Sequence, residues 1–171
     1  MVIFGLSGSG KSFLSRMLAE EMGFLWLRSD VIRKRLAGME PQQSARAPFG
    51  KGIYAEEMTR RVYEEMIEMA KRHVREGKRV VLDATFLRRW QRDLVRLSFD
   101  SPLFILATAP EEVVRERMRS RRDVSDADFT VFLRQKEIFE PPEEIDYVEV
   151  NTDRSPEELR SILKDVVEDD C

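Results

Sequence analysis

The sequence predicts an α/β protein in which helices cover both faces of a five-stranded parallel sheet. Two observations support this prediction. Short apolar runs alternate with helix-like segments along the 171 residues, and chains that alternate in this way form parallel strands joined by crossover helices. Residues 5–12 (GLSGSGKS) also match the phosphate-binding pattern G-x-x-x-x-G-K-[ST] between an apolar run and a helix, which is the context that this pattern requires.

The predicted strands are short runs of β-branched, aromatic and leucine side chains between turn or loop residues. In chain order they cover residues 2–4, 24–28, 79–82, 103–108 and 147–150. Runs that are apolar throughout are typical of strands buried on both faces, as in a parallel sheet between two helical layers.

The predicted helices have apolar residues at helical spacing, together with residues that begin or end a helix. They cover residues 13–22, 31–37, 54–76, 88–98, 110–121 and 125–140, with a last helix that starts at 155. Gly23, Gly38 and Gly77 follow the first three helices, and Pro141 follows the sixth. Residues 38–53 show no periodicity, and a loop of that length in a compact domain is usually functional or mobile.

Composition predicts one domain spanning residues 1–171 and located in the cytoplasm. The formal net charge is −3 and the isoelectric point about 5.5, so no general positive field attracts nucleic acid or an anionic membrane. No apolar run approaches the roughly 18 residues of a membrane span, so we expect no membrane partner. Cys171 is the single cysteine, which excludes a disulfide within the chain and fits a reducing compartment.

Residues 5–12, called the phosphate loop below, are suited to binding a nucleoside triphosphate. Glycines let the backbone curve so that successive N–H groups point at phosphate oxygens, and the following helix directs its positive dipole end at them. Lys11 can reach the β- and γ-phosphates, and the Ser12 hydroxyl can bind Mg²⁺. We therefore expect ATP to contact consecutive residues, namely Gly8, Ser9, Gly10, Lys11, Ser12 and Phe13.

Two aspartates follow predicted strands at the sheet edge where the phosphate loop lies. Asp83 follows the third strand, and from there a carboxylate can hold Mg²⁺ directly or through water; the alternative is a turn cap. Asp30 follows the second strand, and phosphoryl transfer to an alcohol needs a carboxylate near the attacking hydroxyl. Arg33 lies one helical turn later, so both side chains can face an acceptor. The alternative for this pair is a helix N-cap and a surface arginine.

Five arginines occur within residues 115–122. Small phosphotransferases close an arginine-bearing lid over ATP, which neutralises developing charge and excludes water. We expect such a lid at about residues 115–128, with Arg117 and Arg121 taking part in catalysis and Arg122 contacting ATP. The alternative is a solvated helix face stabilised by ion pairs.

Three segments together resemble a known group of proteins. Residues 5–12, 28–33 (RSDVIR) and 80–86 (VVLDATF), followed by the arginine-rich lid, are similar to the P-loop predicted-kinase family. That family includes the ATP-binding half of fusions with an aminoglycoside-phosphotransferase-like domain. It is related to polynucleotide 5′-kinase domains and, more distantly, to zeta toxins. The resemblance implies the P-loop NTPase fold, a three-layer α/β/α sandwich with strand order 2-3-1-4-5.

The resemblance also implies roles for individual residues. In polynucleotide kinases, the aspartate that matches Asp30 is the general base, and the arginine that matches Arg33 binds the acceptor's phosphate. Phe86 stands where many polynucleotide kinases have asparagine, and the chain as a whole is acidic.

We expect an ATP-dependent kinase that transfers the γ-phosphate to an acceptor hydroxyl, with the 5′-OH of a nucleic acid or nucleotide as the first acceptor. A sugar, metabolite or antibiotic is the alternative acceptor, and an ATP-binding switch or ATPase module is the alternative class. Residues 38–53, with Arg46 and Lys51, either line the acceptor cleft or form a plain surface loop. The guanine-binding signature Asn-Lys-x-Asp does not occur, which disfavours a GTPase.

Overall fold

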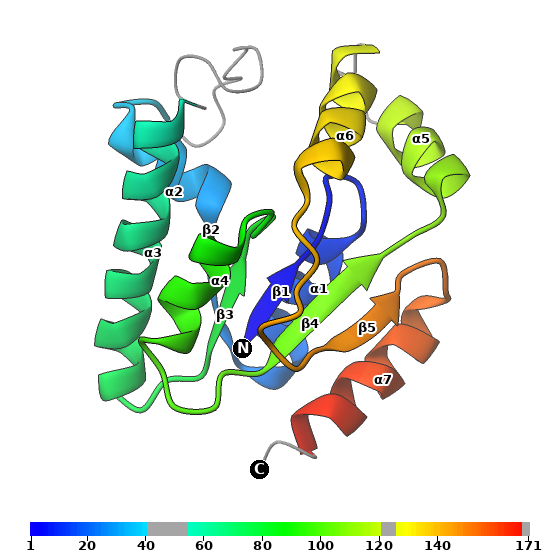
Figure 1. Cartoon of the computed structure of the whole chain (residues 1–171). Helices are drawn as coiled ribbons and strands as arrows, with labels where there is room; N and C mark the ends of the chain where they lie inside the picture. The colour runs from blue at the N-terminus through cyan, green and yellow to red at the C-terminus, as the bar shows by residue number, and fades with distance from the viewer. Residues whose placement is uncertain (41–54, 121–125, 169–171) are drawn as a thin grey trace.

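In the computed structural model, which describes residues 1–40, 55–120 and 126–168, five parallel strands form one sheet (Figure 1). The strands are β1 (Val2–Phe4), β2 (Leu25–Arg28), β3 (Val80–Asp83), β4 (Phe104–Thr108) and β5 (Val148–Asn151). Their order across the sheet is β2-β3-β1-β4-β5, and each neighbouring pair is parallel. The predicted fold class and strand order are confirmed.

Helices connect the strands and cover both faces of the sheet (Figure 1). They are α1 (Lys11–Met22), α2 (Ser29–Leu36), α3 (Glu56–Arg75), α4 (Arg89–Arg96), α5 (Glu111–Ser120), α6 (Asp126–Ile138) and α7 (Pro156–Glu168). The predicted start of α2 at residue 31 was late, because Arg28 is the last extended residue (φ −110°, ψ 124°) and Ser29 is already helical. Asp30 therefore lies in the first helical turn, where a carboxylate interacts favourably with the helix dipole.

Alternate residues of each strand face opposite helical layers. One face packs against α2, α3 and α4, and its strand residues include Val2, Phe4, Val80, Leu82 and Phe104. The other face packs against α1 and α7, and its strand residues include Ile3, Val81, Ile105, Ala107 and Val150. Asp83 lies two residues after Val81 in β3, so its side chain points to the same face of the sheet, the one that packs against α1. The phosphate loop leads into α1 on this face.

The strand order places β3 next to β1, the strand that leads into the phosphate loop, and places β2 on the other side of β3. Ile3 of β1 is the register partner of Asp83, and Asp83 is in turn the partner of Arg28. The residues that end β1, β3 and β2 therefore meet at one edge of the sheet, as expected for the site of an open α/β fold.

Helices α5 and α6 lie at the same edge of the sheet (Figure 1). A small apolar cluster of Val114, Met118 and Phe132 joins them, and Leu6 of the phosphate loop packs against it. In the described ranges, no helix is long and apolar enough to cross a membrane.

Candidate active site

The phosphate loop connects the end of β1 to the start of α1, as the sequence pattern predicted. Gly8 and Gly10 have φ values of 80° and 92°, in a region that residues with a Cβ atom rarely adopt. A Cβ atom on Gly10 would also lie 2.7 Å from Oγ1 of Thr152. Glycine at this position is therefore required by both backbone conformation and space.

Side chains from two helices contact the loop backbone. Lys11 begins α1 and is buried, and its Nζ donates a hydrogen bond to the Leu6 carbonyl oxygen at 2.7 Å. From the other side, the Ser7 N–H donates to Oε1 of Gln135 in α6 at 2.7 Å. The first contact holds the Lys11 ammonium group against the loop, and the second ties the loop to α6.

Asp83 ends β3 and is only 5% exposed. Its Oδ2 accepts hydrogen bonds from the Ser12 hydroxyl at 2.8 Å and from Trp26 Nε1 at 3.1 Å. A hydroxyl and a carboxylate are hard oxygen donors, and Mg²⁺ is usually bound by one or two such groups together with substrate phosphates. The Ser12–Asp83 pair therefore fits the Mg²⁺ ion that the sequence predicted for these two residues.

Asp30 and Arg33 both lie in α2 but contact different partners. The Asp30 side chain lines the cleft, is 47% exposed and forms an ion pair with Lys34 at 3.3 Å. Arg33 is 8% exposed, and its Nη1 donates to Oγ1 of Thr59 in α3 at 3.2 Å. The structure thus places Asp30 where an acceptor could reach it and directs Arg33 toward α3.

Most of the predicted site residues line one cleft of about 660 Å³ at the carboxyl ends of the strands. These residues are Gly8, Gly10, Lys11, Ser12, Phe13, Asp30, Asp83 and Arg117. Ser9, which is buried, and Arg33 are not among the lining residues. The volume lies within the range of small-molecule sites, which is roughly 300–1,000 Å³.

The cleft has further polar lining residues that the sequence reasoning missed. Arg28 ends β2, Thr85 follows β3, and Thr152 and Arg154 follow β5. The rule that selected the two aspartates, a polar residue within two positions after a predicted strand, would also have found Thr152. Trp26 could not be found in this way, because an apolar residue inside a strand carries no such signal.

Arg117 of α5 is bound to the phosphate loop. Its Nη1 donates to the Gly8 carbonyl oxygen at 3.3 Å and to Thr152 Oγ1 at 2.8 Å, and its Nη2 donates to the Thr152 carbonyl oxygen at 2.8 Å. The Thr152 hydroxyl donates in turn to the Ser9 carbonyl oxygen at 2.7 Å. The structure therefore brings one of the predicted lid arginines directly to the loop.

Other predictions concern residues outside the described ranges. Arg121 and Arg122 of the predicted lid are among them, as is the predicted acceptor loop from residue 41 onward, with Arg46 and Lys51. Their assignments therefore stay predictions.

The chain bends at Ala84, directly after β3, and the next residue, Thr85, lines the cleft. Phe86 has a φ of 45°, which is rare for a residue with a large side chain. Its N–H donates to the Tyr63 hydroxyl at 3.0 Å, and its carbonyl oxygen accepts from Arg92 Nη1 at 2.9 Å. Burial raises the pKa of Tyr63 above its ordinary value. Buried side chains thus satisfy both backbone polar groups of the strained residue.

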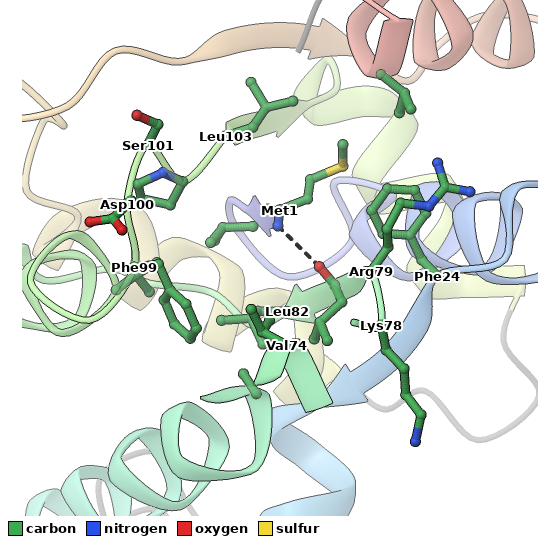
Figure 2. Close-up of a pocket in the computed structure, with 16 residues that line it drawn as sticks. Met1, Phe24, Val74, Lys78, Arg79, Leu82, Phe99, Asp100, Ser101 and Leu103 are labelled. Atoms are coloured by element: carbon green, nitrogen blue, oxygen red, sulfur yellow. Dashed lines mark hydrogen bonds between the residues drawn. The ribbon is translucent and has the colours of Figure 1, made fainter. Parts of the chain in front are cut away.

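A second, smaller hollow of about 240 Å³ lies at the amino-terminal edge of the sheet (Figure 2). Apolar side chains such as Val74, Phe99 and Leu103 make up most of its wall. The Met1 ammonium group donates to the Val80 carbonyl oxygen at 3.0 Å, the dashed line in Figure 2. This hollow contains none of the predicted site residues and lies at the opposite end of the strands from the phosphate loop.

Comparison with solved structures identifies kinases of the same architecture. A sugar kinase from Janibacter sp. HTCC2649 has a TM-score of 0.72 at 22% identity, covering 98% of this chain and 92% of that chain. The APS kinase of Mycobacterium tuberculosis, in complex with AMPPNP and APS, has a TM-score of 0.68 at 20% identity, covering 98% and 96%. A gluconokinase from Sinorhizobium meliloti 1021 has a TM-score of 0.61 at 22% identity, covering 98% and 88%.

At these identities the likeness establishes a shared fold, the kinase-like P-loop fold, and no more. A search among curated proteins gives no match. A family profile described as an AAA domain matches residues 1–142, which is most of the chain. With its phosphate loop between β1 and α1 and its β2-β3-β1-β4-β5 sheet, the chain belongs to this AAA domain family.

Proposed function

We propose that the protein is an ATP-dependent kinase that transfers the γ-phosphoryl group of ATP to a hydroxyl group of an acceptor. One observation carries the proposal: Lys11, Asp30 and the hydrogen-bonded Ser12–Asp83 pair line the same cleft. Phosphoryl transfer to an alcohol needs a phosphate-binding cation, a metal-binding oxygen pair and a base for the acceptor within one site. The kinases among the similar structures support the same class of reaction.

Each residue has a defined role in this proposal. Lys11 and the backbone N–H groups of the phosphate loop bind the β- and γ-phosphates. Ser12 and Asp83 hold Mg²⁺, which when bound supplies positive charge to the phosphate oxygens. Asp30 accepts the proton of the acceptor hydroxyl, whose oxygen forms the new bond to the γ-phosphorus while ADP leaves. Arg117, held between Gly8 and Thr152, adds positive charge at the loop.

We propose two alternative classes of acceptor. The proposal of a 5′-OH of a nucleic acid or nucleotide rests on the resemblance of residues 28–33 to polynucleotide kinases. Acceptor binding by Arg33, which this class implies, requires its side chain to turn from Thr59 toward the cleft. A small molecule such as a sugar is the alternative acceptor, and the kinases named above and the cleft volume of about 660 Å³ are compatible with it. The resemblance to the family that includes fusions with an aminoglycoside-phosphotransferase-like domain adds antibiotics to this second class as a proposal.

The test of the reaction is transfer of labelled γ-phosphate to a panel of 5′-OH oligonucleotides, nucleosides, sugars and aminoglycosides. We expect a labelled product with one acceptor class and none without Mg²⁺. Hydrolysis of ATP with no labelled acceptor in any class would favour the alternative, an ATP-binding switch or ATPase module.

The role of Asp30 is tested by Asp30→Asn, which removes the base and keeps the side-chain shape. We expect the transfer rate to fall by about 10²- to 10⁴-fold, with ATP binding nearly intact. Asp93→Asn is a matched control, since Asp93 also forms an i,i+4 ion pair, with Arg89 at 3.6 Å, but does not line the cleft. Equal turnover in Asp30→Asn and the control would remove Asp30 from the mechanism.

The phosphate-binding role is tested separately by Lys11→Ala. We expect this variant to lose most of its affinity for ATP because the ammonium group at the loop is gone. Wild-type affinity in this variant, measured by calorimetry, would contradict the assignment.

A further inference from the structure

Trp26 lies in β2, on the strand next to the one that carries Asp83. In the pairing of β2 with β3, Arg28 is opposite Asp83 and Trp26 is opposite Val81. The Trp26 side chain packs with the apolar cluster on the α1 face of the sheet, the face to which the Asp83 side chain also belongs. The indole N–H therefore reaches the carboxylate of the neighbouring strand, and donates to Oδ2 at 3.1 Å.

The hydrogen bonds to Asp83 are important because this carboxylate is 5% exposed. A buried carboxylate is stable as an anion only where donors replace the lost water. Ser12 Oγ at 2.8 Å and Trp26 Nε1 at 3.1 Å both donate to the same oxygen, Oδ2. Ser12 belongs to the phosphate loop and its hydroxyl can rotate, whereas the indole nitrogen is a fixed donor with no acceptor capacity. The indole is thus the contact to Asp83 that comes from the sheet and not from the nucleotide-binding loop.

The indole ring is itself held in place. The guanidinium carbon of Arg28 lies over the Trp26 ring, 4.9 Å from its centroid, at a distance typical of a cation–π contact. Arg28 also lines the cleft, together with Ser29 and Asp30. Reorienting the ring would break both this contact and the hydrogen bond to Asp83. Trp26 therefore connects the metal-binding carboxylate with the side of the cleft where Asp30 lies.

We propose that Trp26 is a positioning residue for Mg²⁺ binding, because its indole N–H fixes the orientation of the Asp83 carboxylate. This inference rests on the proposed function, in which Asp83 holds Mg²⁺. Removing a group that orients a metal ligand typically lowers metal affinity or activity by about 10- to 100-fold. Trp26→Phe keeps an aromatic ring under Arg28 but removes the donor. It should therefore weaken the Mg²⁺-dependent part of nucleotide binding by about tenfold.

The experiment is a calorimetric titration of the whole chain with AMPPNP, once with Mg²⁺ and once with EDTA. The readout is the ratio of the two affinities, because a merely structural effect of the substitution lowers both. The ratio should fall about tenfold in Trp26→Phe and stay at the wild-type value in Trp90→Phe. Trp90 is the other tryptophan of the chain, and it contacts Tyr63 at a centroid distance of 5.7 Å outside the cleft lining. An unchanged ratio in Trp26→Phe, or an equal loss of both affinities, would overturn the inference.

A second measurement leaves the Trp26–Asp83 contact intact. In Trp90→Phe, Trp26 is the only tryptophan, so its fluorescence reports on the indole beside Asp83. Adding Mg²⁺ to the AMPPNP-bound variant should change this emission, and constant emission would overturn the inference even if Trp26→Phe does not fold. The two proposals fail differently. A wild-type chain that does not bind AMPPNP overturns the proposed function, whereas Mg²⁺-dependent binding that Trp26→Phe leaves intact overturns only the positioning role.

Discussion

The ion pair between Arg92 and Glu144 gives a strong prediction about stability. The Arg92 side chain is 0% exposed and the Glu144 side chain 6%. Arg92 also donates to the carbonyl oxygens of Phe86 at 2.9 Å and Pro141 at 3.4 Å. Glu144→Gln keeps the side-chain shape but removes the negative charge, so a buried guanidinium group loses its charged partner.

The expected loss follows from the burial of both groups. Removing one partner of a buried ion pair typically costs about 3–5 kcal/mol. Glutamine keeps an amide oxygen that can accept one hydrogen bond, so we expect the lower end, about 3 kcal/mol. For a chain of this length, each kcal/mol lowers the melting temperature by about 2–4 °C, so the midpoint should fall by about 6–12 °C.

The assay is urea unfolding followed by circular dichroism, with a thermal scan of each variant. Glu143→Gln is a matched control, because Glu143 is the neighbouring residue and is exposed. We expect this control to stay within about 0.5 kcal/mol of the wild type. A loss below about 1 kcal/mol for Glu144→Gln would refute the reasoning, since the guanidinium group would then not depend on its buried partner.

Two further predictions concern the loop and the pH dependence of stability. Gly10→Ala should abolish ATP binding in calorimetry, because the new Cβ would lie 2.7 Å from Thr152 Oγ1. Gly77 has a similar φ of 76°, but an added Cβ there would meet nothing within 4 Å, so Gly77→Ala should bind ATP normally. Weak binding in Gly77→Ala would indicate that backbone strain, and not the clash with Thr152, explains the loss in Gly10→Ala. Burial raises the pKa of Tyr63 above its ordinary value of 10.0. The native state therefore keeps a proton that the unfolded chain releases, and the free energy of unfolding should fall as pH rises above about 10. In urea titrations between about pH 9 and 11, Tyr63→Phe should lose less stability than the wild type, and equal losses would contradict this.

Much of the fold could be predicted because its signals are local. The phosphate loop, the short apolar strands and the residues that end helices each lie within a few positions of one another in the chain. The contact between Ser12 and Asp83 was within reach as well, because the carboxyl ends of parallel strands meet at one edge of the sheet. The single-domain organisation, the cytoplasmic location and the roles of the individual site residues stay predictions.

Side-chain direction and distant pairing could not be predicted in this way. Helical spacing places Asp30 and Arg33 one turn apart, but the packing of α2 against α3 decides that Arg33 is buried beside Thr59. Arg92 looks like a surface residue of an amphipathic helix, and its partner Glu144 lies 52 positions later. Pairings of this kind depend on tertiary structure, which one sequence without its relatives does not specify.

The contacts that hold the phosphate loop also determine at which stage of folding the nucleotide site can form. Ser7 is bound to Gln135, Gly8 to Arg117 and Ser9 to Thr152. These partners lie 128, 109 and 143 positions later in the chain, respectively. Contacts between such distant segments must overcome the entropy cost of closing a long loop, and they form late in folding. The ribosome also synthesises the phosphate loop long before β5, the strand that precedes Thr152. We therefore expect a nascent chain to acquire affinity for ATP only after β5 has joined the sheet, so that nucleotide binding reports the completion of the sheet.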